Sequence, residues 1–161
     1  MTDPKGALIE TNAYDLRNRL TSRTDALNKQ TSYVYDGVNN LSQRTDRKGQ
    51  VTHFSYDANN RLSQTSDADG RTTNYTYDLA GNLLSVNDSV AGETLYRYDS
   101  LDRVIGETTD RGIVSYGYDA IGRLTQRTIN GSDPNGTYLS TNIFEHYPQP
   151  IENNKRELTG W

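Results

Sequence analysis

Cysteine is absent from this chain of 161 residues, so it has neither a disulfide framework nor a thiolate zinc site. Proline is absent from Lys5 through Asp133, which leaves every residue of that stretch able to donate a backbone hydrogen bond to a strand ladder. No apolar run approaches the roughly 18 residues of a membrane-spanning helix. The opening segment, MTDPKGALIE, lacks the basic and apolar regions of a secretion signal.

Basic charge and aliphatic residues are also scarce. The formal net charge is −4 and the sequence pI is about 5.1, which provides no basic footprint for nucleic acid. Only 32% of the residues are hydrophobic, and tyrosine accounts for 12 of the aromatics against 2 Phe and 1 Trp. Because tyrosine has an apolar ring and a polar tip, this composition favours a thin sheet over a globule with a thick aliphatic core.

A tyrosine–aspartate pair recurs six times, in four steps of 21 residues and a last step of 20. The pairs are Tyr14-Asp15, Tyr35-Asp36, Tyr56-Asp57, Tyr77-Asp78, Tyr98-Asp99 and Tyr118-Asp119. Two residues before each pair except the first stands another aromatic residue, namely Tyr33, Phe54, Tyr75, Tyr96 or Tyr116. Self-similarity at a period of about 20 to 50 residues is typical of repeat architectures, in which each unit needs its neighbours.

Each unit is predicted to form two short strands and two turns. In TSYVYD, side chains alternate between faces, so Tyr33 and Tyr35 lie on one face of an extended strand. The Asp of each pair opens a turn, where its carboxylate accepts the backbone N–H two residues on. Thr-Asp or a related pair, ending with Thr109-Asp110, leads into the second turn, and there glycines such as Gly49 and Gly70 suit a positive φ.

The units together predict an all-β fold of tandem hairpins laid side by side in a curved sheet. Its exposed strand edges make self-association through those edges an expectation. Four arginines directly precede the aliphatic residue that opens the second strand, and we expect them on the face opposite the tyrosines, which is the wetter one. They are Arg19, Arg61, Arg103 and Arg123.

The phrases YVYDGVNNLSQRTDRKG, YTYDLAGNLLSVND and YGYDAIGRLTQRT follow the pattern YxYDxxGRLxxxTDxxG. This pattern resembles the Rhs or YD-repeat family, which includes bacterial polymorphic toxins, subunits of insecticidal toxin complexes, wall-associated proteins and teneurins. The resemblance implies a segment of a β-spiral shell that often encloses a C-terminal toxin. Known shells use many more than six repeats, so the chain resembles a fragment of one.

The resemblance also implies a structural, non-enzymatic module of a secreted or cell-surface protein, which forms part of a shell or stalk for a toxin or adhesion region. Its partners would be the remainder of the shell or that toxin. No cofactor and no metal site are expected. The six paired aspartates are about 10 Å or more apart, one per repeat, which does not suit paired acid–base catalysis.

Residues 131–161 leave the repeat register, after an extension at 1–9 and six repeats at 10–130. They are interpreted as a terminal cap that adds a strand to the last repeat, the start of a variable toxin region, or an unstructured tail. Asp133, Pro134 and Gly136 stand in SDPNGTYL, which resembles part of the self-cleavage motif PxxxxDPxGL but has Thr137 in place of its Leu. An ordinary Asp-Pro-Asn-Gly turn is the favoured interpretation.

The row of tyrosines leaves a second functional hypothesis open. Exposed aromatic rings flanked by Asn and Asp stack on sugars, so the chain is alternatively a carbohydrate-binding adhesion module. Its glycan-stacking face would consist of Tyr33, Tyr75, Tyr77, Tyr96 and Tyr116. The favoured alternative is that these rings form the packing layer of the strip.

Overall fold

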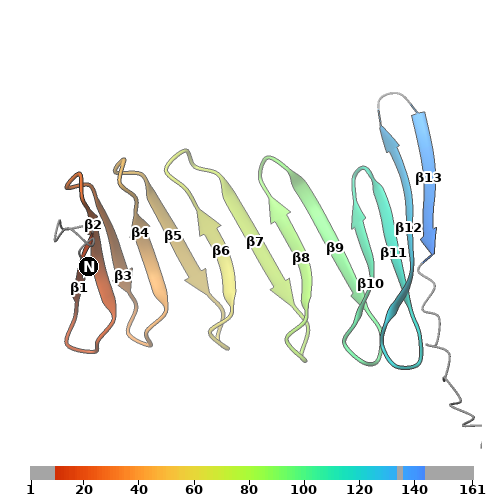
Figure 1. Cartoon of the computed structure of the whole chain (residues 1–161), viewed down its shortest axis with the longest axis horizontal. Coiled ribbons are helices and arrows are strands. Elements are labelled where there is room, and N and C mark those ends of the chain that lie inside the picture. The colour runs from red at the N-terminus through yellow and green to blue at the C-terminus, as the bar shows by residue number, and fades with distance from the viewer. Residues whose placement is uncertain (1–9, 134–135, 144–161) are drawn as a thin grey trace, which may run out of the picture.

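The computed structural model describes residues 10–133 and 136–143, which form one sheet of 13 antiparallel strands (Figure 1). Each strand pairs with its neighbours in sequence, and the described part contains no helix, hence none that could cross a membrane. The predicted all-β fold of tandem hairpins is confirmed. The strands are β1 (Glu10–Tyr14), β2 (Leu20–Asp25), β3 (Gln30–Tyr35), β4 (Leu41–Thr45), β5 (Val51–Tyr56), β6 (Leu62–Ser66), β7 (Thr72–Tyr77), β8 (Leu83–Asp88), β9 (Gly92–Tyr98), β10 (Val104–Thr109), β11 (Gly112–Tyr118), β12 (Leu124–Asp133) and β13 (Gly136–Ile143).

The turns after the Tyr–Asp pairs lie along one rim of the sheet, and the second turns lie along the other (Figure 1). In the first of them, the Asp15 carboxylate accepts the N–H groups of Arg17 and Arg19 at 2.9 and 3.0 Å. Asn18 takes a left-handed φ of 59° and donates its N–H to the Asp15 carbonyl. The side chain therefore caps the turn, as the sequence predicts.

The second turns use the same design. The Asp46 carboxylate accepts the N–H groups of Lys48 and Gln50 at 2.7 and 3.0 Å, and Gly49 has the left-handed φ, 83°. Because a side chain at a φ of this kind costs free energy, glycine or asparagine occupies the position in nearly every turn.

The turn between β10 and β11 corrects one detail of the sequence alignment. The sequence aligned Asp110 with the capping aspartates, but Thr109 occupies that place, and its hydroxyl accepts the N–H of Arg111 at 3.2 Å. Thr109 pairs with Gly112 across two intervening residues, whereas Asp88 pairs with Gly92 across three. The missing residue explains why the last step of the repeat is 20.

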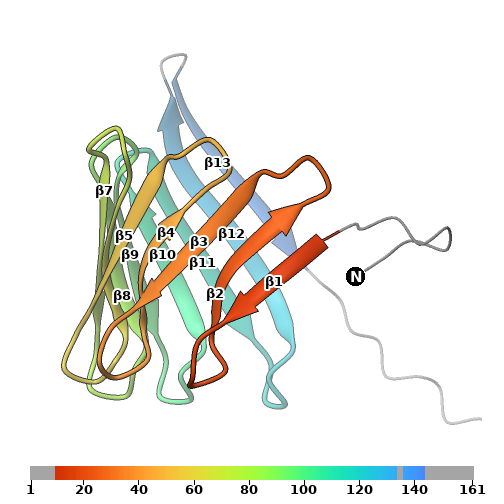
Figure 2. The ribbon, with the colours of Figure 1, turned by 90° about the vertical axis from the view of Figure 1, so that its left-hand side faces the viewer.

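A register shift next to each Tyr–Asp turn curves the sheet. Tyr35 lies opposite Leu41 and Val34 opposite Gln43, so Ser42 is an extra residue in the second strand of the hairpin. The same shift occurs in the other five Tyr–Asp hairpins. Since bulges increase local twist and bend the sheet, the row of hairpins curves without closing on itself (Figure 2).

The last hairpin crosses the predicted boundary between residues 130 and 131. Strand β12 continues to Asp133, and β13 pairs with it from Gly136 to Ile143. The strand expected in this segment therefore begins at Gly136. Asp133 and Gly136 face each other at the end of the ladder, while Pro134 lies outside the described residues.

The sheet has no conventional hydrophobic core. No hydrophobic side chain of the described residues is buried, and Ser85 is the buried polar residue of this part. The turns expose large aliphatic side chains, with Leu16 and Leu79 fully accessible. Strand ladders and contacts within one layer therefore provide most of the cohesion of the described part.

Replacing Gly49 with alanine should lower the free energy of unfolding by about 1 kcal/mol, because its φ of 83° is unfavourable for a residue with a Cβ atom. Gly37 is the matched control, since its φ is not positive and an added Cβ would meet nothing within 4 Å. Gly37→Ala should leave stability unchanged or slightly higher. Urea denaturation followed by circular dichroism measures both, and equal losses would contradict the turn assignment.

Candidate functional site: the contacts that join the repeats

A hydrogen bond from the paired tyrosine joins each unit to the unit before it. The backbone ladder between β2 and β3 runs from Thr24↔Gln30 to Ser22↔Ser32 and includes no pair at Leu20. There the Tyr35 hydroxyl donates to the Leu20 carbonyl at 2.9 Å. The side chain thus replaces a missing rung of the ladder. Four further bonds of this kind are Tyr56 to Leu41 (3.0 Å), Tyr77 to Leu62 (2.9 Å), Tyr98 to Leu83 (2.9 Å) and Tyr118 to Val104 (2.8 Å).

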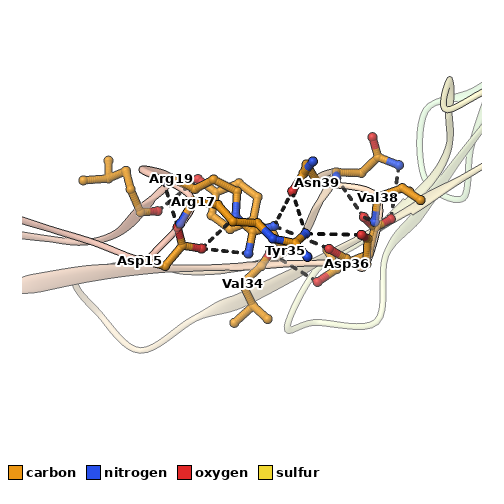
Figure 3. Close-up of polar contacts among 12 residues, drawn as sticks. Asp15, Arg17, Arg19, Val34, Tyr35, Asp36, Val38 and Asn39 are labelled. Atoms are coloured by element: carbon orange, nitrogen blue, oxygen red, sulfur yellow. Dashed lines mark hydrogen bonds and ion pairs between the residues drawn. The ribbon is translucent and has the colours of Figure 1, made fainter.

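An arginine covers the tyrosine ring in alternate junctions. The guanidinium carbon of Arg19 lies 4.6 Å from the centre of the Tyr35 ring, and Asp15 holds the same arginine at 2.7 Å (Figure 3). Arg19 also reaches the Asp36 carbonyl at 3.5 Å. We call this set of contacts, together with the tyrosine hydroxyl bond, the clasp. It recurs with Asp57, Arg61, Tyr77 and with Asp99, Arg103, Tyr118.

The clasp corrects the expected position of these arginines. Arg19, Arg61 and Arg103 lie over the tyrosines of the next unit, not on a wetter opposite face. They directly precede the first residue of their strands, in the turn, where the alternation of strand side chains does not apply. Arg123 pairs with Asp119 at 2.6 Å and stays more exposed, at 47% of its side chain.

Asparagine replaces the arginine in the other two junctions. The Asn40 side-chain nitrogen donates to the Asp36 carboxylate at 3.1 Å and to the Asn60 amide oxygen at 3.0 Å. Asn82 bridges Asp78 and Asp102 in the same manner, at 3.1 and 2.7 Å. The shorter side chain therefore links adjacent turns instead of covering a ring.

The electrostatics of the clasp suit neutral pH. The backbone N–H of Arg61 and then its guanidinium, against some desolvation, lower the pKa of Asp57 below its ordinary value. The hydrogen bond from the Arg103 side chain is the first cause of the lowered pKa of Asp99. At the two asparagine junctions, desolvation raises the pKa of the Tyr56 and Tyr98 hydroxyls. At neutral pH the Asp57 and Asp99 carboxylates are thus ionised and the Tyr56 and Tyr98 phenols protonated, as their hydrogen bonds require.

The proposed glycan-stacking tyrosines have mixed surroundings. Tyr77 belongs to a clasp, and its ring is covered by Arg61. The Tyr116 hydroxyl donates to the Glu107 carboxylate at 2.9 Å. Tyr33, Tyr75 and Tyr96 are half-buried. No contact in the described part points to a sugar, and the glycan-stacking face stays a prediction.

Sequence reasoning missed the pairing of arginine with tyrosine. The available signal is a nearly constant offset, since Arg19 and Arg61 each precede the tyrosine that they cover by 16 residues and Arg103 precedes Tyr118 by 15. The aspartate carboxylates predicted to cap the turns accept hydrogen bonds from backbone N–H groups and from arginine side chains. No group of three His, Cys, Asp or Glu side chains able to hold a metal ion occurs in the described ranges.

Tyr77→Phe should lower the free energy of unfolding by about 1 kcal/mol, because the Leu62 carbonyl loses its donor. Tyr75→Phe is the control, since the Tyr75 hydroxyl has no hydrogen-bond partner within the described residues. It should leave stability nearly unchanged. Urea denaturation of both variants is the measurement, and an equal loss in Tyr75→Phe would contradict a specific role for the clasp.

Stability should fall in acid, because the pKa values of the turn aspartates are lower in the folded chain than their ordinary value of 3.8. The ionised carboxylates stabilise the fold above that value, and this stabilisation is lost as the pH falls through the folded-state values. Urea denaturation between about pH 2 and pH 7 tests the effect. Asp57→Asn, which cannot titrate, should show a shallower dependence, and a flat profile in the parent chain would refute the prediction.

Comparison with known proteins agrees with this geometry. Crystal structures of TcdB2-TccC3-TEV and TcdB2-TccC3-Cdc42 each align with a TM-score of 0.53 and 18% identity, over 83% of this chain and 10% of theirs. TcdB2-TccC3 aligns with a TM-score of 0.51 and 18% identity, over 81% of this chain and 10% of its own. The chain thus spans about a tenth of their length, and at this identity the likeness shows the fold alone.

The sequence comparison is more specific. No curated protein matches the chain. The model of the RHS Repeat family matches residues 14–51, 35–72, 56–94, 77–114 and 98–138, in overlapping tandem copies that span all six Tyr–Asp pairs. These matches confirm the resemblance inferred from the sequence, and the chain belongs to the RHS Repeat family.

Proposed function

We propose that the chain is a structural segment of the wall of an Rhs-type shell or stalk, which encloses or presents a toxin or an adhesion region. The observation that carries the proposal is the hydrogen bond from each paired tyrosine to the preceding unit, because it occurs at all five junctions between the six Tyr–Asp hairpins, and the clasp reinforces it at alternate junctions. A wall built by one repeated junction extends by adding units and keeps its curvature. The family match and the shared fold support this role.

The hydrogen bonds that hold the aspartates of the Tyr–Asp turns support a role without catalysis. In Asp57, one oxygen accepts the N–H groups of Asn59 and Arg61, and the other accepts the Arg61 guanidinium. The other paired aspartates cap their turns in the same way. An acid or base in a reaction needs a carboxylate free to exchange a proton with the substrate, and these side chains are held in place.

The exposed aliphatic side chains support assembly with more protein. Five Tyr–Asp turns place a large aliphatic residue on the same rim of the sheet, 64% or more exposed. They are Leu16, Val38, Leu79, Leu101 and Ile121. An open one-layer sheet with an apolar rim gains stability when further wall or enclosed protein covers it. The remainder of the shell and its toxin are therefore the proposed partners, and the proposed location is outside the cell.

To test the proposal, the native gene product that contains this chain is purified and its particles are imaged by electron microscopy. Limited trypsin digestion of the same sample is carried out in parallel. Hollow or elongated particles that protect an internal region from trypsin are expected. Tyr77→Ala should open the wall and expose that region, whereas Tyr75→Ala should preserve protection better because it leaves the clasp intact. Monomeric particles with no protected region would overturn the proposal.

A further inference from the structure

Two adjoining depressions lie at the β1 end of the sheet, over β2, β3 and β4. Their volumes are about 340 and 300 Å³, and they share Thr31, Tyr33 and Arg47, so they form one continuous cleft. We call it the basic cleft. Its cations and central ring are Arg23, Lys29, Tyr33, Arg44, Arg47 and Lys48.

Positive charge is concentrated at this end of an acidic chain. Between Glu10 and Val51 there are seven Lys and Arg against five Asp and Glu. From Thr52 to Asp133 there are seven against twelve. The cleft therefore lies in the one part of the strip where the summed charge attracts anions.

Three cations of the cleft form no ion pair, although Arg44 and Lys48 also attract the Asp46 carboxylate, which lines the cleft as well. Arg23 pairs with Glu10, and Arg47 pairs with Asp25 at 3.1 Å. Lys29, Arg44 and Lys48 form no ion pair with any carboxylate of the described residues.

The ring at the centre of the cleft has a free hydroxyl. Tyr33 lies directly across the strand pair from Arg44. Its hydroxyl makes no hydrogen bond within the described part, whereas Tyr116, at the matching place of a later unit, donates to Glu107. An incoming anion would thus meet three cations and a phenol donor.

The same location one unit further on has the opposite charge. Twenty-one residues after Arg44, Arg47 and Lys48 stand Thr65, Ala68 and Asp69. The depression there shares Arg44 and Asp46 with the basic cleft, and its further charged residues are Asp67 and Asp69, with no cation besides Arg44. The repeat geometry does not require a basic cleft, so its cations are a local feature of the first two units.

We propose that the basic cleft binds an acidic polypeptide segment in an extended conformation. The two depressions together provide more volume than a single small anion fills, and their cations come from two strands and two turns. The carboxylates of Glu10, Asp25 and Asp46 stand among the cations and would repel a densely charged polymer, whereas a peptide alternates its acidic side chains with neutral ones. This inference holds whether or not the chain forms a shell wall.

The test measures fluorescence anisotropy of a fluorescein-labelled peptide of alternating Glu and Ser, titrated with the full chain at low salt. A peptide with Gln in place of Glu is the neutral control. The variant with Lys29→Gln, Arg44→Gln and Lys48→Gln should bind about tenfold more weakly, as the loss of three exposed ion pairs of modest strength implies. Added salt should weaken binding by the parent chain.

The matched control changes the same total charge elsewhere, with Arg71→Gln, Arg97→Gln and Arg111→Gln, all exposed residues outside the cleft. In a parallel titration at about 0.15 M salt, where the Debye length is about 8 Å and charges outside the cleft are screened, it should keep the affinity of the parent within about twofold. Equal weakening in both triple variants would overturn the site. Absence of saturable binding, or equally tight binding of inorganic polyphosphate with the same dependence on the three cations, would overturn the peptide assignment.

Discussion

The hydrogen bond from each paired tyrosine to the carbonyl of the preceding unit is the contact on which the rest of the sheet depends. The backbone ladder between units contains only a few pairs, such as Ser22↔Ser32 to Thr24↔Gln30, and stops short of the Tyr–Asp rim. The hydroxyl of Tyr35 continues the connection at that rim. Without it, the Leu20 carbonyl would lose its partner, and the connection at that rim would depend on side-chain contacts such as that of Arg19 with the Asp36 carbonyl.

The surrounding side chains hold that tyrosine in place. Asp15 organises its own turn through two N–H groups and at the same time orients Arg19, which covers the Tyr35 ring. One carboxylate therefore couples the shape of a turn to the junction with the next hairpin. Because every strand contacts only its sequence neighbours, stability is a sum over such units and junctions. These units and junctions hold the sheet together, although no hydrophobic side chain is buried in its described part.

Several features were predictable because they depend on local rules. The period of 21 indicated the repeat, and alternation placed Tyr33 and Tyr35 on one face. The turn aspartates follow from the geometry of a carboxylate two residues from an N–H group. The arginine prediction was wrong because Arg19 belongs to a turn, and the backbone there does not follow strand alternation. The Thr109 cap was missed because a hydroxyl can replace a carboxylate at that place.

The sequence by itself determined the family, the all-β class, the length of the unit and the two turns, since each of these is written in residues close together in the chain. Only the tertiary structure decided which groups meet across the junctions: Arg19 over Tyr35, the hydroxyl at Leu20, and the cations gathered around Tyr33. Those contacts depend on how far one hairpin is shifted and bent against the next. That shift arises from a bulge in each hairpin, which a repeating pattern of residue types does not reveal.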